Sequence, residues 1–271
     1  MNYKMKAAIL GAEGFLGSEL YNCFNGHYDV YGITRTNYNA KRGEEFDIFI
    51  NANGNSKRYW ANNNILKDFE ASTLSVYKTF SDFKIKFYIY ISSADVYAKH
   101  GDLSKTKEET IINSMNLCPY GFHKYLSELI VKKYANKYLI LRSSAMVGES
   151  MKKGPIKDVL DGKPLFITLD SKLQFISTSE IAMIITKLVS DNIHNEIFNV
   201  GGVGTVSFNY LERILRKKLI VQQEAEKQIY EMDVAKLRMI FPLRKSEEYV
   251  QDCLNKLNSE DIRSERMDKS I

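Results

Sequence analysis

A tyrosine and a lysine stand at i and i+4 in the segment 119–124, whose sequence is PYGFHK. On a helix this spacing places the side chains of Tyr120 and Lys124 on one face, about one turn apart. A lysine ammonium beside a phenol stabilises the phenolate and lowers the phenol pKa from roughly 10 toward working pH, which makes tyrosine a usable general acid or base. Because many amphipathic helices carry this spacing by chance, the pair alone favours a surface contact.

A serine pair gives the first support for a catalytic interpretation. Ser92 and Ser93 follow the apolar run 87–91, so they stand at the carboxyl end of an expected strand. In an open parallel sheet, ligands bind at that edge. A hydroxyl there could hold a carbonyl or alcohol oxygen while a tyrosine moves its proton. Serine pairs also cap strand ends without a catalytic role, but the joint pattern predicts a catalytic set of Ser93, Tyr120 and Lys124.

A glycine loop gives the second support. Gly-x-x-Gly-x-x-Gly lies between an apolar run at 6–10 and a helical pattern at 18–24. In this context the glycines allow a tight turn, close approach of the backbone to a pyrophosphate, and close packing of the helix, whose N-terminus binds the phosphate. The alternative is an ordinary glycine-rich turn between a strand and a helix. The loop predicts the following dinucleotide-binding residues: Gly11, Gly14, Phe15, Leu16 and Gly17.

The end of the second expected strand, 29–34, bears on the choice of dinucleotide. NAD sites usually place an acidic residue there, whereas an arginine accommodates the 2′-phosphate of NADP. This strand ends in Thr34 and Arg35 with no acidic residue, and Lys41 and Arg42 follow. NADP is therefore favoured over NAD, although Arg35 could simply be exposed.

Strands and helices alternate in the first half of the chain. The strands are expected at 6–10, 29–34, 46–50, 87–91 and 138–141, and the helices at 18–24, 62–84 and 120–136. Near-continuous apolar strands indicate a parallel sheet covered on both faces, so the fold class is α/β, a Rossmann-like doubly wound sheet.

The rhythm becomes less regular after Gly148. Short extended pieces are expected over 150–180, a strand at 196–200, and helices at 181–189, 211–217 and 246–257. We therefore expect a dinucleotide-binding core at 1–148 and a flexible polar tail at 258–271. Between them, 149–257 would complete the core and form a small C-terminal substrate lobe.

The bulk properties narrow the function classes. The chain has 271 residues, 44% hydrophobic and 26% charged, with a formal charge of +5 spread along it. The three cysteines and four histidines form no metal-type spacing, so no metal site is expected. No basic stripe interleaves with aromatic residues, which argues against nucleic-acid binding. No apolar run has the length of a membrane span or the shape of a signal peptide, so a cytoplasmic protein without membrane contact is expected.

From residue 6 to 255 the chain resembles the extended short-chain dehydrogenase/reductase family, in its NAD-dependent epimerase/dehydratase group that modifies nucleotide sugars. The matching segments are the glycine loop, YISSADVY at 90–97, and PYGFHK at 119–124, with weaker matches at 141–148, 174–182 and 198–201. The resemblance implies that Ser93 steadies the substrate oxygen, Tyr120 transfers the proton, and Lys124 also holds the nicotinamide ribose. Asn53 and Tyr120 would also contact the cofactor.

Departures from the family pattern refine the expectation. The family's 4,6-dehydratases have Thr-Asp-Glu where this chain has Ser93, Ala94 and Asp95. The first carboxylate is absent, which disfavours dehydration. Few residues separate Arg35 from the third strand, so the adenine pocket should be abbreviated, as in shorter family members that reduce 4-keto sugars. Asn53-Gly54 replaces the usual Ala-Ala, and Ser72 stands for an expected Asn.

The leading hypothesis is NADPH-dependent reduction of a nucleotide-linked keto sugar in carbohydrate biosynthesis, with hydride from nicotinamide and a proton from Tyr120. The alternative is a nucleotide-sugar 4-epimerase with tightly bound NAD, and a lesser one is a non-catalytic dinucleotide sensor. Members of the family often pair through two long helices, here 62–84 and 120–136, which leaves a homodimer open.

Overall fold

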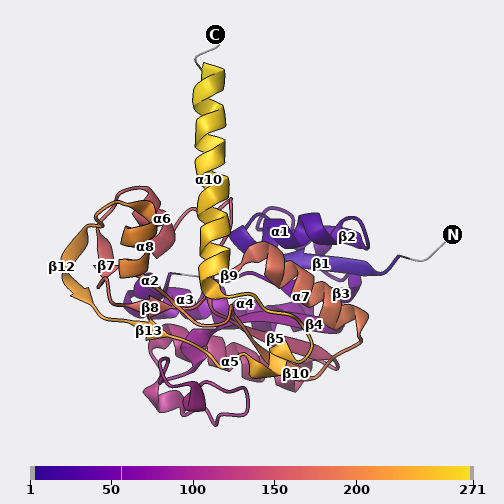
Figure 1. The fold of residues 1–271 in the computed structure, drawn as a ribbon. Helices are drawn as coiled ribbons and strands as arrows, with labels where there is room; N and C mark the ends of the chain where they lie inside the picture. The colour runs from indigo at the N-terminus through magenta and orange to yellow at the C-terminus, as the bar shows by residue number, and fades with distance from the viewer. Residues whose placement is uncertain (1–3, 56, 269–271) are drawn as a thin grey trace.

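A six-stranded parallel sheet forms the centre of the protein (Figure 1). The structure is a computed structural model that describes residues 4–55 and 57–268. The sheet has the strand order β10-β5-β4-β3-β1-β2. Its strands are β1 (Lys6–Leu10), β2 (Asp29–Ile33), β3 (Glu45–Asn51), β4 (Lys84–Ser93), β5 (Tyr138–Ser143) and β10 (Glu196–Val200). The predicted Rossmann-like α/β fold is confirmed.

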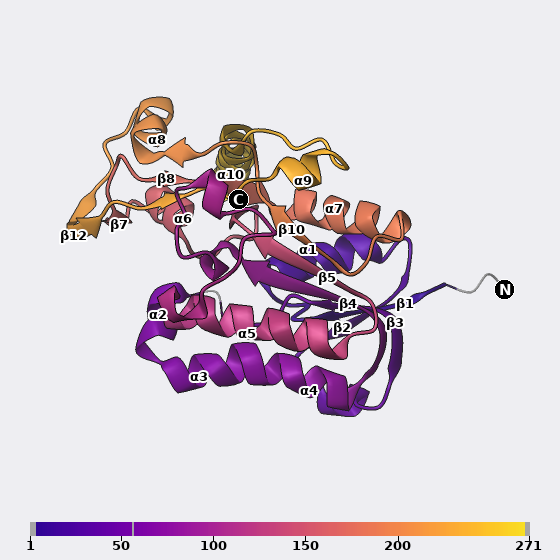
Figure 2. The same ribbon diagram turned by 90° about the horizontal axis from the view of Figure 1, so that it is seen from below.

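Helices cover both faces of this sheet (Figure 2). One face carries α1 (Phe15–Phe24) and α7 (Thr178–Ser190), and the other carries α4 (Ser75–Asp82) and α5 (Pro119–Tyr134). Side chains alternate between the faces along each strand. In β1, for example, Ala7 and Ile9 pack in the core with α1, whereas Ala8 and Leu10 pack in the core with α4 and α5. Burial on both faces explains why the strands read as continuous apolar runs.

The strand order reverses at β1, which lies between β2 and β3. In open α/β sheets the ligand crevice lies at the carboxyl ends of the strands beside such a reversal. Residues 34–44, all of them described, contain only the 3₁₀ turn η1 (Asn39–Lys41), and β2 is the edge of the sheet. The expected lack of an extra βα unit between β2 and β3 is confirmed, and the abbreviated adenine pocket stays a prediction.

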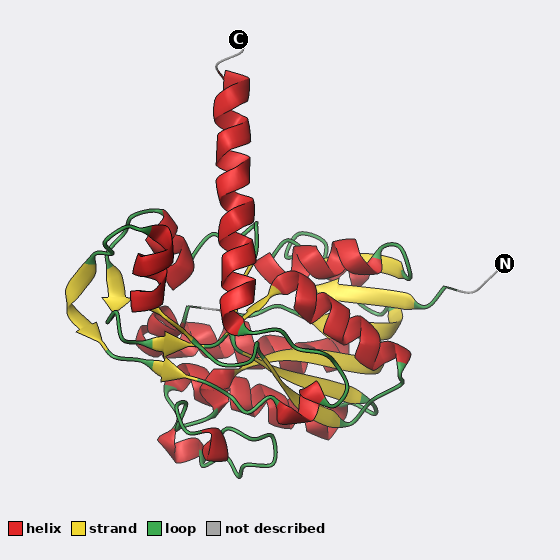
Figure 3. Cartoon of the chain, in the orientation of Figure 1, coloured by secondary structure: helices red, strands yellow, loops and turns green. Residues whose placement is uncertain are grey.

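The second half of the chain contributes both to the core and to a lobe on the left of Figures 1 and 3. Helix α7 and strand β10 belong to the core. The lobe contains α6 (Pro155–Leu160), β7 (Leu165–Ile167), β8 (Lys172–Leu173), β11 (Val206–Ser207), α8 (Phe208–Leu215), β12 (Val221–Glu226) and β13 (Ile229–Tyr230). Strands β6 (Ala145–Val147) and β9 (Phe175–Ser177) pair with each other, and α9 is Ala235–Arg238. The division of the chain at residue 148 stays a prediction.

Three helical segments differ from the expectation. The helix expected at 62–84 is interrupted at Asn64, whose non-helical torsions separate α2 (Arg58–Asn63) from α3 (Ile65–Phe69). From α3 it continues through the π-helical turn η2 (Glu70–Leu74) into α4. Helix α6 was missed, although Pro155 at its first turn is a common helix start. Helix α10 runs Ser246–Asp268, beyond the expected end at 257 (Figure 3). The flexible tail at 258–271 stays a prediction, and residues 269–271 lie outside the described part.

Candidate active site

Helix α5 and strand β4 bring Tyr120 to Ser93. Ser93 ends β4, and its Oγ accepts a hydrogen bond from the Asp95 N–H at 3.2 Å, which starts the 3₁₀ turn η3 (Ala94–Val96). Helix α5 packs so tightly on this turn that a Cβ at Gly121 would stand 2.1 Å from the Asp95 carbonyl oxygen. Glycine is therefore required directly after the tyrosine. This close packing brings Tyr120 beside Ser93, whose own hydroxyl donates to the Asp95 carboxylate at 3.1 Å.

The phenol of Tyr120 is buried and in its protonated form at neutral pH. The side-chain amide oxygen of Asn62 accepts the Tyr120 N–H at 3.2 Å and fixes the first turn of α5. Burial raises the pKa of Tyr120, the Asp95 carboxylate raises it further, and the neighbouring Ser93 hydroxyl opposes the rise. Burial and the Asp95 and Asp68 carboxylates raise this pKa, so the expected lowering toward working pH is not found. A protonated phenol is a proton donor.

Lys124 lies beneath the end of β4 with its ammonium fully enclosed. Its Nζ donates to the carbonyl oxygen of Ile91 at 3.2 Å and lies 5.3 Å from the ring centroid of Tyr90. Burial lowers the pKa of Lys124 to about 8, against neighbouring carboxylates that raise it. A Cβ at Gly54 would stand 3.5 Å from this Nζ, so the ammonium lies at the loop after β3, next to Asn53.

The glycine loop meets the same edge of the sheet. Gly11 has φ +87°, and a Cβ there would stand 3.2 Å from the backbone of Ala52 and Asn53. A Cβ at Gly17 would stand 2.0 Å from the Gly11 carbonyl oxygen, so α1 begins directly against the loop. Gly14 is the N-cap of α1 and offers no side-chain cap. The backbone N–H groups of the first turn therefore remain for an anion.

The backbone at the end of β2 is fixed by Asn37, whose Oδ1 accepts the Thr34 N–H at 2.8 Å. Next to it, Arg35 is exposed and has no hydrogen bond or ion pair with any residue that the structure describes. The other nearby cations are engaged: Arg42 pairs with Asp82 at 2.7 Å, and Lys41 pairs with Glu44. Arg35 is thus the cation available at this edge.

The residues present fit a nicotinamide dinucleotide. The backbone cradle made by the glycine loop has no room for a Cβ at Gly17, and the free N–H groups of α1 point to a phosphate. Lys124 and Asn53 lie at the neighbouring strand end. How the individual site residues contact a cofactor stays a prediction.

Sequence reasoning missed two buried ionic groups around α5. Arg142 of β5 makes a bidentate pair with Glu128, with Nη2 2.7 Å from Oε2, and Ser92 donates to the same carboxylate at 2.6 Å. Asp68 of α3 contacts His123 at 2.7 Å. Arg142 and His123 lie in segments that the sequence singles out, but nothing in the spacing indicates their carboxylate partners.

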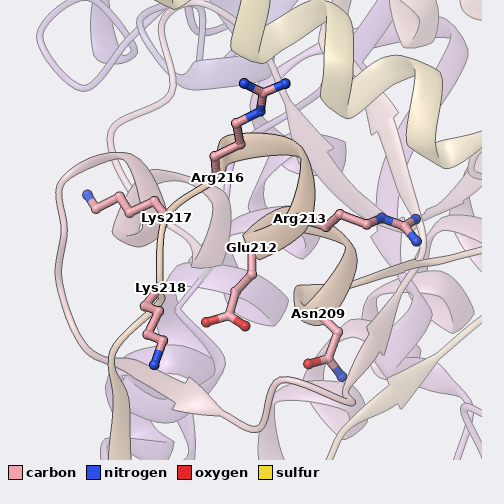
Figure 4. Close-up of a pocket in the computed structure, with 6 residues that line it drawn as sticks. All are labelled: Asn209, Glu212, Arg213, Arg216, Lys217 and Lys218. Carbon is pink, nitrogen blue, oxygen red and sulfur yellow. The ribbon is translucent and has the colours of Figure 1, made fainter.

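A surface pocket of about 330 Å³ lies on the lobe, away from the strand-end site (Figure 4). It is lined by Asn209, Glu212, Arg213, Arg216, Lys217 and Lys218, none of which is a predicted site residue.

Within residues 4–55 and 57–268, no group of three or more His, Cys, Asp or Glu residues could hold a metal ion. In the same ranges, no helix has the length and apolar character needed to cross a bilayer.

Most of the chain matches a known protein family. The sequence profile of the NAD dependent epimerase/dehydratase family matches residues 7–201. The chain belongs to this family. Family membership confirms the resemblance drawn from the motifs and makes the chain an enzyme that uses a nicotinamide dinucleotide. Curated protein sequences give no match.

Solved structures of this family have the same fold. A dTDP-4-dehydrorhamnose reductase from Bacillus anthracis in complex with NADP has a TM-score of 0.76 at 18% identity, covering 94% of this chain and 99% of that one. A UDP-galactose 4-epimerase gives the same values. A UDP-glucose 4-epimerase from Thermotoga maritima has a TM-score of 0.76 at 14% identity, covering 95% and 100%. The fold is therefore shared by reductases and epimerases.

Proposed function

We propose that this family member is an NADPH-dependent reductase of a nucleotide-linked 4-keto sugar. The observation that carries the proposal is the buried, protonated Tyr120 packed beside Ser93 and Asp95 at the edge where the glycine loop ends. The first turn of α1, at Phe15 and Leu16, would bind the pyrophosphate. Thr34 and Arg35 would hold the 2′-phosphate.

The chain's own residues would carry the proton. The bound nicotinamide supplies a hydride. The Ser93 hydroxyl orients the substrate carbonyl, and Tyr120 donates its proton to the carbonyl oxygen as negative charge develops there. Lys124, whose pKa is about 8, is charged at neutral pH and stabilises the phenolate that remains. It would also hold the nicotinamide ribose, beside Asn53.

Two observations favour a reductase over the family's other reactions. Ala94 leaves no carboxylate directly after Ser93, which disfavours dehydration. Arg35 has no partner among the described residues, which favours the phosphorylated cofactor. A nucleotide sugar is the substrate class because solved structures with this fold include a reductase and epimerases of such sugars. The proposal also includes a cytoplasmic location, which agrees with the three cysteines being free thiols.

The test follows NADPH absorbance with a panel of nucleotide 4-keto sugars. We expect stoichiometric NADPH consumption with one of them. Tyr120→Phe should lower turnover by roughly 10²-fold or more while NADPH binding persists. Tyr134→Phe is the matched control, because Tyr134 lies on the same helix and is half exposed, so its turnover should equal wild type.

Other outcomes decide between the alternatives. Protein purified with tightly bound NAD that interconverts sugar epimers without consuming NADPH would show a 4-epimerase instead. Binding of NADPH without turnover of any substrate would favour a non-catalytic sensor.

A further inference from the structure

A fully buried carboxylate lies beside the candidate site and has no assigned role. Asp68 of α3 is 0% exposed. Its Oδ2 is 2.7 Å from Nδ1 of His123, and its Oδ1 accepts hydrogen bonds from Asn55 Nδ2 at 3.0 Å and Ser72 Oγ at 3.3 Å. A buried charge is costly unless such partners satisfy it. Three contacts from three different segments fix the orientation of this carboxylate.

These contacts tie Asp68 to the turn of α5 that carries Lys124. His123 immediately precedes the lysine, and the carbonyl oxygen of His123 accepts hydrogen bonds from Thr73 at 3.1 Å and Ser127 at 2.8 Å. The position of a Cβ on Gly54 would be 3.5 Å from Lys124 Nζ and 3.8 Å from Ser72 Oγ, the hydroxyl that donates to Asp68. The Lys124 ammonium and the Ser72 hydroxyl that donates to Asp68 therefore flank the same glycine.

The surroundings of Asp68 are those of a functional position. Ser72 lies in the π-helical turn η2, an irregularity that often marks functional sites. Asn55 follows closely after Asn53 in the loop between β3 and α2. Asp68 thus joins α3, α5 and this loop, so it also fixes the segment that carries a predicted cofactor residue.

The neighbouring charges single out Asp68. Three carboxylates face Lys124 and raise its pKa: Asp68 of α3, Glu128 of α5 and Asp95 of η3. Glu128 is bound by the guanidinium of Arg142, and Asp95 by that of Arg58 at 3.3 Å. Asp68 contacts an imidazole, an amide and a hydroxyl, so of the three it is the one without a guanidinium partner. It also raises the pKa of Tyr120.

We propose that Asp68 is a positioning residue that keeps Lys124 charged and holds it at the cofactor edge. The role of Lys124 toward the ribose rests on the proposed function. If Asp68 had only a structural role, its removal would lower stability without changing the pH at which Lys124 loses its proton.

The experiment measures the dissociation constants of NADPH and NADH against pH from 7 to 9.5 by nucleotide fluorescence. This range lies above the second pKa of a phosphate, roughly 6. Wild-type affinity should fall through about pH 8 as Lys124 loses its proton. Lys124→Arg should remove this midpoint, because a guanidinium stays charged throughout.

Asp68→Asn should move the midpoint to lower pH by roughly one unit and weaken binding at pH 8 several-fold. The amide can still accept from Asn55 and Ser72, so the variant should fold. Asp82→Asn is the matched control, since Asp82 is also a buried carboxylate, bound by Tyr38 at 2.9 Å and by Arg42. Both variants should lower the melting temperature, but only Asp68→Asn should move the midpoint.

His123→Gln provides a second measurement that does not depend on the folding of Asp68→Asn. Its amide can still donate to the carboxylate, so the midpoint should stay at the wild-type pH. A midpoint unmoved in Asp68→Asn, or moved in His123→Gln, would overturn the positioning role. A wild-type protein that binds NADPH and NADH equally would overturn the NADP assignment alone. The positioning role would stand, because it concerns the nicotinamide ribose, which both nucleotides share.

Discussion

Arg35 offers the sharpest test of the cofactor assignment. It is exposed at the end of β2 and unpaired within the described chain, so Arg35→Ala removes a free cation without breaking an internal contact. A hydrogen bond to a charged group contributes about 1.5–3 kcal/mol, and solvent screening reduces this to about 1–2 kcal/mol at an exposed site. We therefore expect the dissociation constant of NADPH to rise by roughly 5–30-fold, since 1.4 kcal/mol corresponds to about tenfold.

NADH lacks the 2′-phosphate, so its affinity should change less than about twofold in the same variant. The assay is fluorescence titration of both nucleotides at low and high salt. Wild-type affinity for NADPH should fall with salt, and the variant should lose most of that dependence. Arg42→Ala is the matched control: Arg42 follows in the same loop but is held by Asp82. Equal losses for NADPH and NADH in Arg35→Ala would refute the reasoning.

Three further predictions concern the loop, the core and the surface. Gly17→Ala would place a Cβ 2.0 Å from a backbone oxygen and should weaken NADPH binding by roughly tenfold or more, whereas Gly26→Ala, with no atom within 4 Å of the new Cβ, should bind as wild type in the same titration. Glu128→Gln leaves the Arg142 guanidinium without its buried counter-charge and should cost about 3–5 kcal/mol in denaturant unfolding; an unchanged midpoint would contradict the burial argument. If the homodimer forms through α3 to α5, Leu66→Glu should shift light-scattering mass from dimer to monomer, because Leu66 is 70% exposed on α3; a monomeric wild type would remove this proposal.

The sheet and the strand-end placement of the site could be predicted because their signals are local. Apolar runs buried on both faces identify parallel strands, and Ser93 and the glycine loop directly follow such runs. These signals depend on residues that lie close together in the sequence. The packing of α5 on η3 joins Gly121 to Asp95 from distant segments, and no local pattern indicated it.

Features that depend on distant segments could not be predicted. Asp68 reaches His123 from another helix, across a π-helical turn with no distinctive sequence pattern. The direction of the Tyr120 pKa also depended on burial and on Asp95, neither of which a spacing of tyrosine and lysine reveals. A sequence motif identifies the groups, but the fold determines their protonation.

That protonation bears on the direction of the reaction. An epimerase begins by oxidising an alcohol, so its tyrosine must first accept a proton, and a low phenol pKa assists this step. A reductase begins by protonating a carbonyl oxygen, which requires the phenol form. Burial raises the pKa of Tyr120, and Asp95, held by Arg58 at 3.3 Å and by Tyr230 of the lobe at 3.2 Å, raises it further. The carboxylate that persists after Ala94 thus favours Tyr120 as a proton donor, which is the role that the reduction step of either reaction requires.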